Sequence, residues 1–409
     1  MLLAHNVGGG ALPAPPWLLS YIGAFAVIAT AAALRATGTT PRIARFALVE
    51  PEATLDSGGR LAGRLVGLAL FALVLVAAIV GPDSGAANIA PVAVLVIWWV
   101  GLPILCLLLG DVMRAINPFD AIVGLLDRRT NERDPEEAPS WTGAAFLAAF
   151  AWFFIAYHRP GSPRALAVFL LAYALAAVLG GLRWGRSWLV TGEGFGALSA
   201  AVALLSPGGR TGARPPGVTP LIVVWLGSTT FDAFTSTPFW VDVLGTSQGW
   251  TRTLLNTVGL VWLTAIVAGV YLVALRIAER ADSDAPTTSL VEPLGVALVP
   301  LALGWFLAHD LTLLLFEGQN FYALLSDPIG EGWDLFGTIH HTIDYRVVQA
   351  TWVRWSQVGL LAAGHVAAVV IAHDVALRLV RRRAAMRTTW ALATAATGSI
   401  VAGALMVLG

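Results

Sequence analysis

The sequence of 409 residues contains one cysteine, no lysine and few charged side chains of either sign. The single cysteine, Cys106, excludes an intrachain disulfide and any zinc or iron–sulfur site built from several cysteines. Charged residues make up 12% of the chain, whereas a soluble domain has about 25%. The formal net charge is zero, which gives a nucleic-acid partner no electrostatic support.

Hydrophobic residues are abundant instead: they account for 57% of the chain, and the mean hydropathy is +0.74. Several apolar runs reach the roughly 18–20 residues that a helix needs to cross a bilayer, without the alternation of barrel strands. We therefore predict an all-α polytopic transmembrane helical bundle of about ten spans, forming one integral membrane domain over residues 1–409 in a lipid bilayer. The predicted spans are 17–35, 61–80, 91–109, 142–157, 165–182, 188–206, 254–277, 290–317, 352–378 and 388–408.

Two segments depart from the pattern of simple spans. The span 188–206 contains Glu193 between glycines, so a re-entrant hairpin is an alternative there. The apolar segment 219–228 is too short to span, and we expect it to be interfacial or re-entrant. Two long outer loops are expected at about 207–253 and 318–351, and long ordered loops are often functional.

Arginine placement sets the predicted orientation, because basic residues concentrate on the cytoplasmic side. Five arginine-rich connections fall on one side if there are ten spans with both termini outside. Four arginines fall on the opposite side in this topology: Arg159, Arg164, Arg210 and Arg214.

Ionisable residues inside predicted spans are costly and need an explanation. His309 and Asp310 lie within the span 290–317, Glu317 lies at its outer end, and His365 lies near the middle of a later span. Histidine and carboxylate side chains together are a ligand set for Zn, Mn, Fe or Cu. A pairing of His309 with Asp310 or with a neighbouring helix is the structural alternative, and a haem held by His309 and His365 is another.

The expected outer loop 318–351 adds His340, His341 and Asp344, which could be further ligands. Their spacing is not that of the HExxH motif, and a wet interface would also accommodate these side chains. The segment around Asp232 mixes aromatic and hydroxyl side chains with this one acid, and it could line an outer pocket or form an interfacial turn.

Several motifs together carry a resemblance that extends over nearly the whole chain. They are Asp111-Val-Met-Arg-Ala-Ile-Asn-Pro118, Gly192-Glu-Gly-Phe-Gly196, Ser228-Thr-Thr-Phe-Asp232-Ala-Phe-Thr-Ser-Thr-Pro238, and Gly318-Gln-Asn-Phe-Tyr322 with Ser326-Asp-Pro328 and Gly332-Trp-Asp-Leu-Phe-Gly337. With these, the sequence resembles the fenitrothion hydrolase-like membrane proteins of actinobacteria. The resemblance implies a multi-pass protein of the bacterial plasma membrane that hydrolyses organophosphorus triesters at a P–O–aryl bond.

The polar residues and the resemblance give one functional hypothesis: hydrolysis, assisted by a divalent transition metal, of a hydrophobic small-molecule ester at the outer membrane face. In this hypothesis five residues are metal ligands: His309, His340, His341, Asp344 and His365. Three carboxylates take catalytic roles: Asp310, Asp232 and Glu317. The alternative is a transporter, a channel or an integral subunit of a larger membrane complex without catalysis.

Overall fold

A computed structural model describes residues 15–42, 57–126, 138–207, 217–280 and 290–408. All regular secondary structure in these residues is helical, and nine helices are long and apolar enough to cross a membrane. The chain is thus an all-α, multi-pass membrane protein, as its sequence predicts. Large apolar side chains are exposed along α2 (Ser57–Val80), α8 (Pro163–Trp184) and α13 (Gly249–Arg280), which is the pattern of lipid-facing helices.

The chain divides into two compact units, where the sequence suggests a single domain. Unit 1 contains Glu50–Gly217 and Asp310–Val347, and unit 2 contains Gly8–Val49, Val218–His309 and Val348–Gly409. The chain passes from unit 2 to unit 1 inside the helix α15 (Leu298–Thr312), between His309 and Asp310.

Unit 1 is built on α2 and α8, together with several helices that change type or are short. The first of these runs through α3 (Ile89–Val92), a π-helical segment (Ala93–Trp98) and α4 (Trp99–Leu109). The others are α5 (Met113–Ile116), α6 (Pro118–Leu126), α7 (Thr142–Ala151) with the π-helical Trp152–Ala156, α9 (Trp188–Thr191), α10 (Gly194–Ala203), the π-helical Leu313–Glu317 and α16 (Gly318–Leu325).

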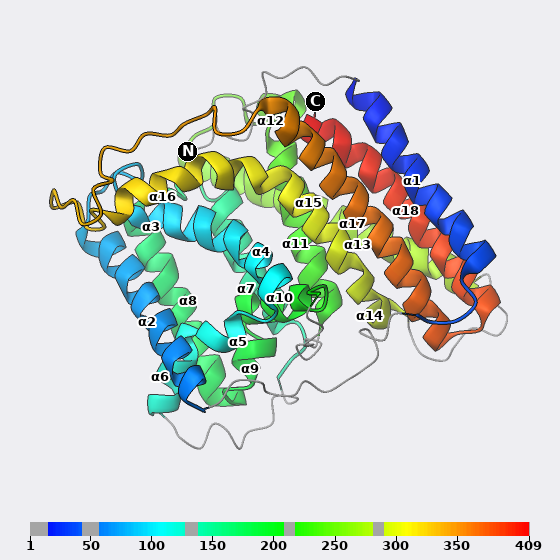
Figure 1. Cartoon of the computed structure of the whole chain (residues 1–409), viewed down its shortest axis with the longest axis horizontal. Helices are drawn as coiled ribbons and strands as arrows, with labels where there is room; N and C mark the ends of the chain where they lie inside the picture. Colours follow the sequence, from blue (N-terminus) through cyan, green and yellow to red (C-terminus); the bar gives the residue numbers. More distant parts are fainter. Residues whose placement is uncertain (1–14, 43–56, 127–137, 208–216, 281–289, 409) are drawn as a thin grey trace. The chain divides into compact units, whose positions relative to one another are not determined.

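Unit 2 contains longer and more regular helices. Helix α1 (Pro16–Thr37) packs along α18 (Arg382–Leu408), which also packs on α17 (Ala350–Leu379) and α13 (Figure 1). The remaining elements are α11 (Val218–Thr235), α12 (Pro238–Leu244), α14 (Val291–Leu294), a 3-10 turn (Gly295–Ala297) and α15 as far as His309.

The apolar run 219–228 is part of a longer helix than the sequence predicts, and much of the expected loop 207–253 is helical. This region forms α11, whose 18 residues are enough to cross a membrane, and α12. The helix continues past the apolar run because its hydroxyl side chains donate to carbonyls of their own helix: Thr229 Oγ1 to Trp225 O at 2.9 Å and Thr230 Oγ1 to Leu226 O at 2.7 Å. These residues therefore add length without needing water. Residues 208–216 of the expected loop lie outside the described residues.

The segment 188–206 turns back inside unit 1, which favours the re-entrant alternative. Asn117, at the end of α5, donates to the Leu189 carbonyl at 3.2 Å. Glu193 then reaches Tyr173, midway along α8, whereas Ser199 returns to Asp111, just beyond α4, at 2.7 Å. Since α10 has only 10 residues, it rises about 15 Å, half the thickness of a bilayer core. Both arms of this hairpin therefore start from the same end of unit 1.

Candidate functional site

The two predicted site residues that unit 2 brings together are Asp232 of α11 and His309 of α15. The Nε2 atom of His309 lies 3.1 Å from Oδ2 of Asp232. Only 7% of His309 and 9% of Asp232 is exposed, so the pair is screened from solvent. A carboxylate bound to an imidazole orients the ring and stabilises its protonated form. The pair can therefore hold and release a proton in an apolar environment.

The surroundings of Asp232 explain why it needs a partner from another helix. Nearby hydroxyl groups of α11 bond to their own helix, as Thr230 does and as Thr235 does to the Asp232 carbonyl at 2.7 Å. A carboxylate has no donor proton of its own when ionised and must accept hydrogen bonds instead. His309 supplies such a donor at the one ring nitrogen that faces the carboxylate.

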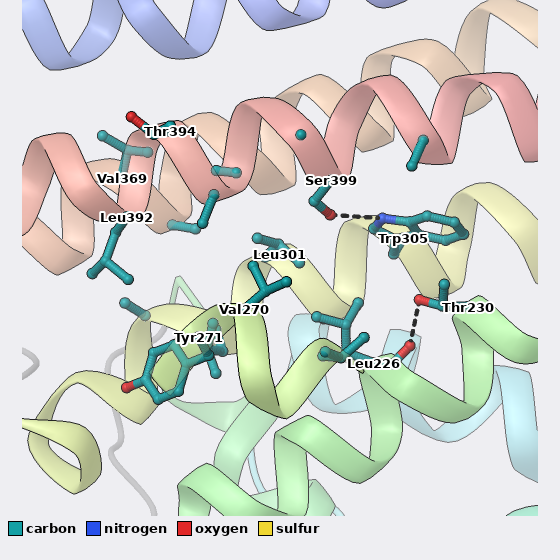
Figure 2. A pocket seen from close by; sticks show the side chains of 18 of the residues that line it. Leu226, Thr230, Val270, Tyr271, Leu301, Trp305, Val369, Leu392, Thr394 and Ser399 are labelled. Carbon is teal, nitrogen blue, oxygen red and sulfur yellow. Dashed lines mark hydrogen bonds between the residues drawn. The ribbon is translucent and has the colours of Figure 1, made fainter. Parts of the chain in front are cut away.

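An apolar cavity of about 370 Å³ lies within unit 2, one helical turn from this pair. Its walls come from α11, α13, α15, α17 and α18 (Figure 2). Trp305, which lines the cavity, precedes His309 by four residues, and Thr230 precedes Asp232 by two. Four residues correspond to a rise of about 6 Å. Neither Asp232 nor His309 lines the cavity itself, but each lies within one helical turn of a residue that does.

The cavity opens toward the outer surface of unit 2. Of the lining residues, Ile266 is 41% and Val270 48% exposed on α13, and Thr394 and Gly398 are exposed on α18. In a membrane protein such an apolar surface meets lipid rather than water. A lipophilic molecule can therefore reach the cavity from within the bilayer.

His365 of α17 is fully buried in unit 2, and both of its ring nitrogens have partners. Its Nδ1 lies 2.7 Å from the Leu361 carbonyl oxygen, and its Nε2 lies 3.2 Å from Ser399 Oγ. Ser399 lines the cavity and also accepts a hydrogen bond from Trp305 Nε1 at 3.4 Å (Figure 2). A metal or a haem at His365 would have to displace one of these two partners.

Paired glycines position His365. A Cβ atom on Gly364 would come within 2.6 Å of the Pro300 carbonyl oxygen, and one on Gly304 within 2.5 Å of the Leu360 carbonyl oxygen. The backbones of α15 and α17 therefore approach as closely as helices can, the usual role of small residues between membrane helices. His365, the residue after Gly364, is held in the same contact.

Three further predicted site residues belong to unit 1 and are exposed. His340, His341 and Asp344 are exposed in the segment after α16, where His341 meets the ring of Tyr322 edge-on with centroids 5.4 Å apart. The backbone N–H of Asp344 donates to Gln319 Oε1 at 2.9 Å, and its carboxylate accepts from Arg346 N at 2.8 Å.

Two predicted carboxylates remain on the helix that carries His309. Glu317 is half-buried at the end of the π-helical turn, and Asp310 directly follows His309 in α15 and is buried. Ser399 and Trp305 are absent from the predicted site. Their sequence surroundings give no signal, since a single serine or tryptophan in an apolar helix is common.

Comparison of the chain with models of protein families, with characterised proteins and with solved structures finds no match.

Proposed function

We propose that this chain is a membrane-embedded hydrolase of lipophilic organophosphorus esters. The observation that carries the proposal is the buried Asp232–His309 pair beside an apolar cavity of the same unit. The resemblance of the sequence to fenitrothion hydrolase-like proteins supplies the substrate class, and the apolar lining suits the aryl group of such an ester.

The pair supports a general-base step. The imidazole of His309 takes a proton from a water molecule as the water attacks phosphorus, and the P–O–aryl bond breaks. Asp232 stabilises the imidazolium ion, which returns the proton to the departing aryl oxide. A positioned base of this kind contributes roughly 10²–10⁴-fold to a rate.

A divalent transition metal held by the same pair is the alternative to this general-base step. The carboxylate of Asp232 and the imidazole of His309 are suitable ligand types, and Asp310 follows in the same helix. A bound metal would polarise the phosphoryl oxygen and lower the pKa of a bound water. Metal analysis of purified wild type beside His309→Ala tests this; about one equivalent in the wild type, lost in the variant, is the expected result.

We propose a plasma-membrane location with both termini outside. The nine long apolar helices, which include α11, and the shorter helix Thr142–Ala156 make ten crossings, an even number, when the hairpin of α9 and α10 is re-entrant. Within unit 1, a Cβ on Gly217 would come within 1.8 Å of the Ser140 carbonyl oxygen, so Gly217 lies beside a segment we assign to the cytoplasmic side. Arg210 and Arg214, which lie outside the described residues, then belong to a cytoplasmic connection and agree with the arginine-based orientation.

Transport is the second candidate function, and the re-entrant hairpin favours it. Non-helical backbone at membrane depth occurs where it is buried in protein or lines a substrate path, and interrupted helices form the binding sites of many transporters. Glu193 at the turn of the hairpin is the residue that such a path would use. Substrate-dependent flux in liposomes, without turnover, would support this candidate.

The test of the hydrolase uses full-length protein in liposomes with diethyl 4-nitrophenyl phosphate, which releases 4-nitrophenolate on hydrolysis. We expect His309→Gln and Asp232→Asn to lower kcat/KM by at least ~100-fold without lowering the melting temperature in proportion. The control His373→Gln changes another buried histidine of unit 2, bonded to Thr389 at 2.9 Å, and should keep the activity. No turnover by the wild type above protein-free liposomes, with and without added divalent metals, would exclude this function.

A further inference from the structure

The cavity wall of unit 2 contains a hydroxyl group in contact with a histidine. Ser399 of α18 is half-buried and lines the cavity, while His365 lies behind it with no exposed surface. The distance of 3.2 Å between Ser399 Oγ and His365 Nε2 is at the upper end of hydrogen-bond reach. These residues lie on α17 and α18, whereas the Asp232–His309 pair lies on α11 and α15.

The direction of each hydrogen bond follows from the chemistry of the groups. A carbonyl oxygen only accepts, so His365 carries its proton on Nδ1 and donates it to the Leu361 carbonyl at 2.7 Å. A neutral imidazole then has an acceptor at Nε2, and the Ser399 hydroxyl donates to it. The indole N–H of Trp305 only donates, so Ser399 Oγ accepts from it at 3.4 Å.

The hydrogen bonds from Ser399 to His365 and from His365 to the Leu361 carbonyl match the arrangement that activates a serine nucleophile. The nucleophile contacts a base, the base is oriented by a third group, and the hydroxyl faces a space for substrate. The third group here is a backbone carbonyl rather than an aspartate. By contrast, Thr394 also lines the cavity, but its hydroxyl donates to the Trp390 carbonyl of its own helix at 2.9 Å.

We propose that Ser399 and His365 form a second reactive site, which captures lipophilic acyl or phosphoryl compounds covalently. The Ser399 oxygen attacks the carbonyl carbon or the phosphorus while its proton moves to His365 Nε2. The bond to the leaving group breaks, and the departing alkoxide or aryl oxide takes the proton from His365. Ser399 is left as an ester that holds the captured group, so this site releases a leaving group once per chain.

The cavity selects the compounds that this site accepts. Its lining is almost entirely aliphatic and aromatic, with small residues such as Ala395, Ala396 and Ala402 around Ser399. No Arg, Lys, Asp or Glu is among the lining residues, so a charged substrate would enter without compensation. The ligand class is therefore a neutral ester with an alkyl or aryl chain.

The experiment treats the full-length protein in liposomes with a long-chain alkyl fluorophosphonate and measures the adduct by intact-protein and peptide mass spectrometry. We expect one adduct per chain, located at Ser399 and absent in Ser399→Ala. We expect His365→Gln to slow labelling by at least ~100-fold, and the control Thr394→Ala to label like the wild type. An adduct at another residue, or equal labelling of His365→Gln, would overturn the proposal.

A second variant tests whether a reagent can reach position 399, separately from whether the Ser399 hydroxyl is activated. Ser399→Cys places a thiol in the cavity of a chain whose native cysteine, Cys106, has no exposed surface. Alkylation of this thiol by a lipophilic maleimide, together with no fluorophosphonate adduct on wild-type Ser399, would show an accessible but unactivated hydroxyl and reject the proposal. No alkylation would show a closed cavity and reject it as well. Because labelling does not require turnover, an adduct at Ser399 without phosphotriester hydrolysis would reject only the function proposed above.

Discussion

The two units bury carboxyl groups with different partners. In unit 1, Glu193 accepts the backbone N–H groups of Phe195 and Gly196, at 3.0 and 2.8 Å, and the hydroxyl of Tyr173. In unit 2, Asp232 meets the imidazole of His309 from another helix. The first arrangement caps a helix, whereas the second joins two groups that can exchange a proton beside a cavity. Burial alone therefore does not identify a functional acid in this chain.

We expect Glu193 to support the stability of the fold and the Asp232–His309 pair to support activity. The cap satisfies backbone donors that the first turn of α10 would otherwise leave unpaired inside the protein. The Asp232–His309 pair connects side chains, so isosteric changes there alter proton transfer more than they alter the fold. We expect variants of the two carboxyl groups to affect different measurements.

The largest expected change in stability comes from Glu193→Ala. It leaves two backbone N–H groups and one hydroxyl without their acceptor, which we expect to lower the free energy of unfolding by about 3 kcal/mol. Reversible unfolding in mixed micelles measures this quantity. Tyr173→Phe, which removes one donor and keeps the cap, should cost only about 1 kcal/mol.

The opposite outcome for Glu193 would reverse the roles of the two carboxyl groups. If Glu193→Ala unfolds like the wild type while hydrolysis or flux disappears, the residue is functional and unit 1 holds the working site. Retained activity per folded molecule is the result that agrees with a capping role.

A smaller effect is expected where α15 and α17 touch. In Gly364→Ala the added methyl group meets the Pro300 carbonyl oxygen and the Gly304 Cα, at 2.6 and 3.0 Å. Backbone atoms cannot change rotamer to make room, so we expect α15 and α17 to move apart and the free energy of unfolding to fall by about 2 kcal/mol. We also expect labelling of Ser399 to slow, because His365 moves with α17. Thermal unfolding and fluorophosphonate labelling are the measurements.

Gly359→Ala is the matched control in the same helix. A Cβ at this position meets nothing within 4 Å, so alanine should stabilise the helix by about 0.5–1 kcal/mol. Equal effects of the two substitutions would show that the close approach of α15 and α17 does not position His365.

The sequence predicts the helical class and most of the helices, because long apolar runs leave few other structures in a bilayer. It fails at α11, where Thr229 and Thr230 lower the hydropathy but bond to their own helix. For the candidate site, it singles out His309 as an ionisable residue inside a predicted span, and Asp232 as the one acid in a segment of aromatic and hydroxyl side chains. Their pairing, and the contact of His365 with Ser399, each join two different helices, and no local sequence pattern reveals how separate helices pack.

The smallest expected effect concerns Asp111, a half-buried carboxyl of unit 1 outside the spanning helices. Burial raises its pKa, while the Ser199 hydroxyl at 2.7 Å and the Arg114 N–H at 3.2 Å oppose the shift in part. The folded state therefore binds the proton more tightly than the unfolded state. As pH rises from the ordinary aspartate range through the raised pKa, the folded state loses this advantage, and the free energy of unfolding falls.

We expect Asp111→Asn to remove this slope, because asparagine keeps the acceptor oxygen but carries no titrating proton. Ser199→Ala should steepen it, because loss of the hydroxyl donor destabilises the carboxylate and raises the pKa of Asp111 further. Unfolding measured in steps from about pH 4 to 7 tests both variants. If the free energy of unfolding of Asp111→Asn still falls with pH as in the wild type, another acid of the chain titrates in this range. Glu193→Gln is then the variant to compare, because it tests whether the carboxyl group that caps α10 also carries a proton.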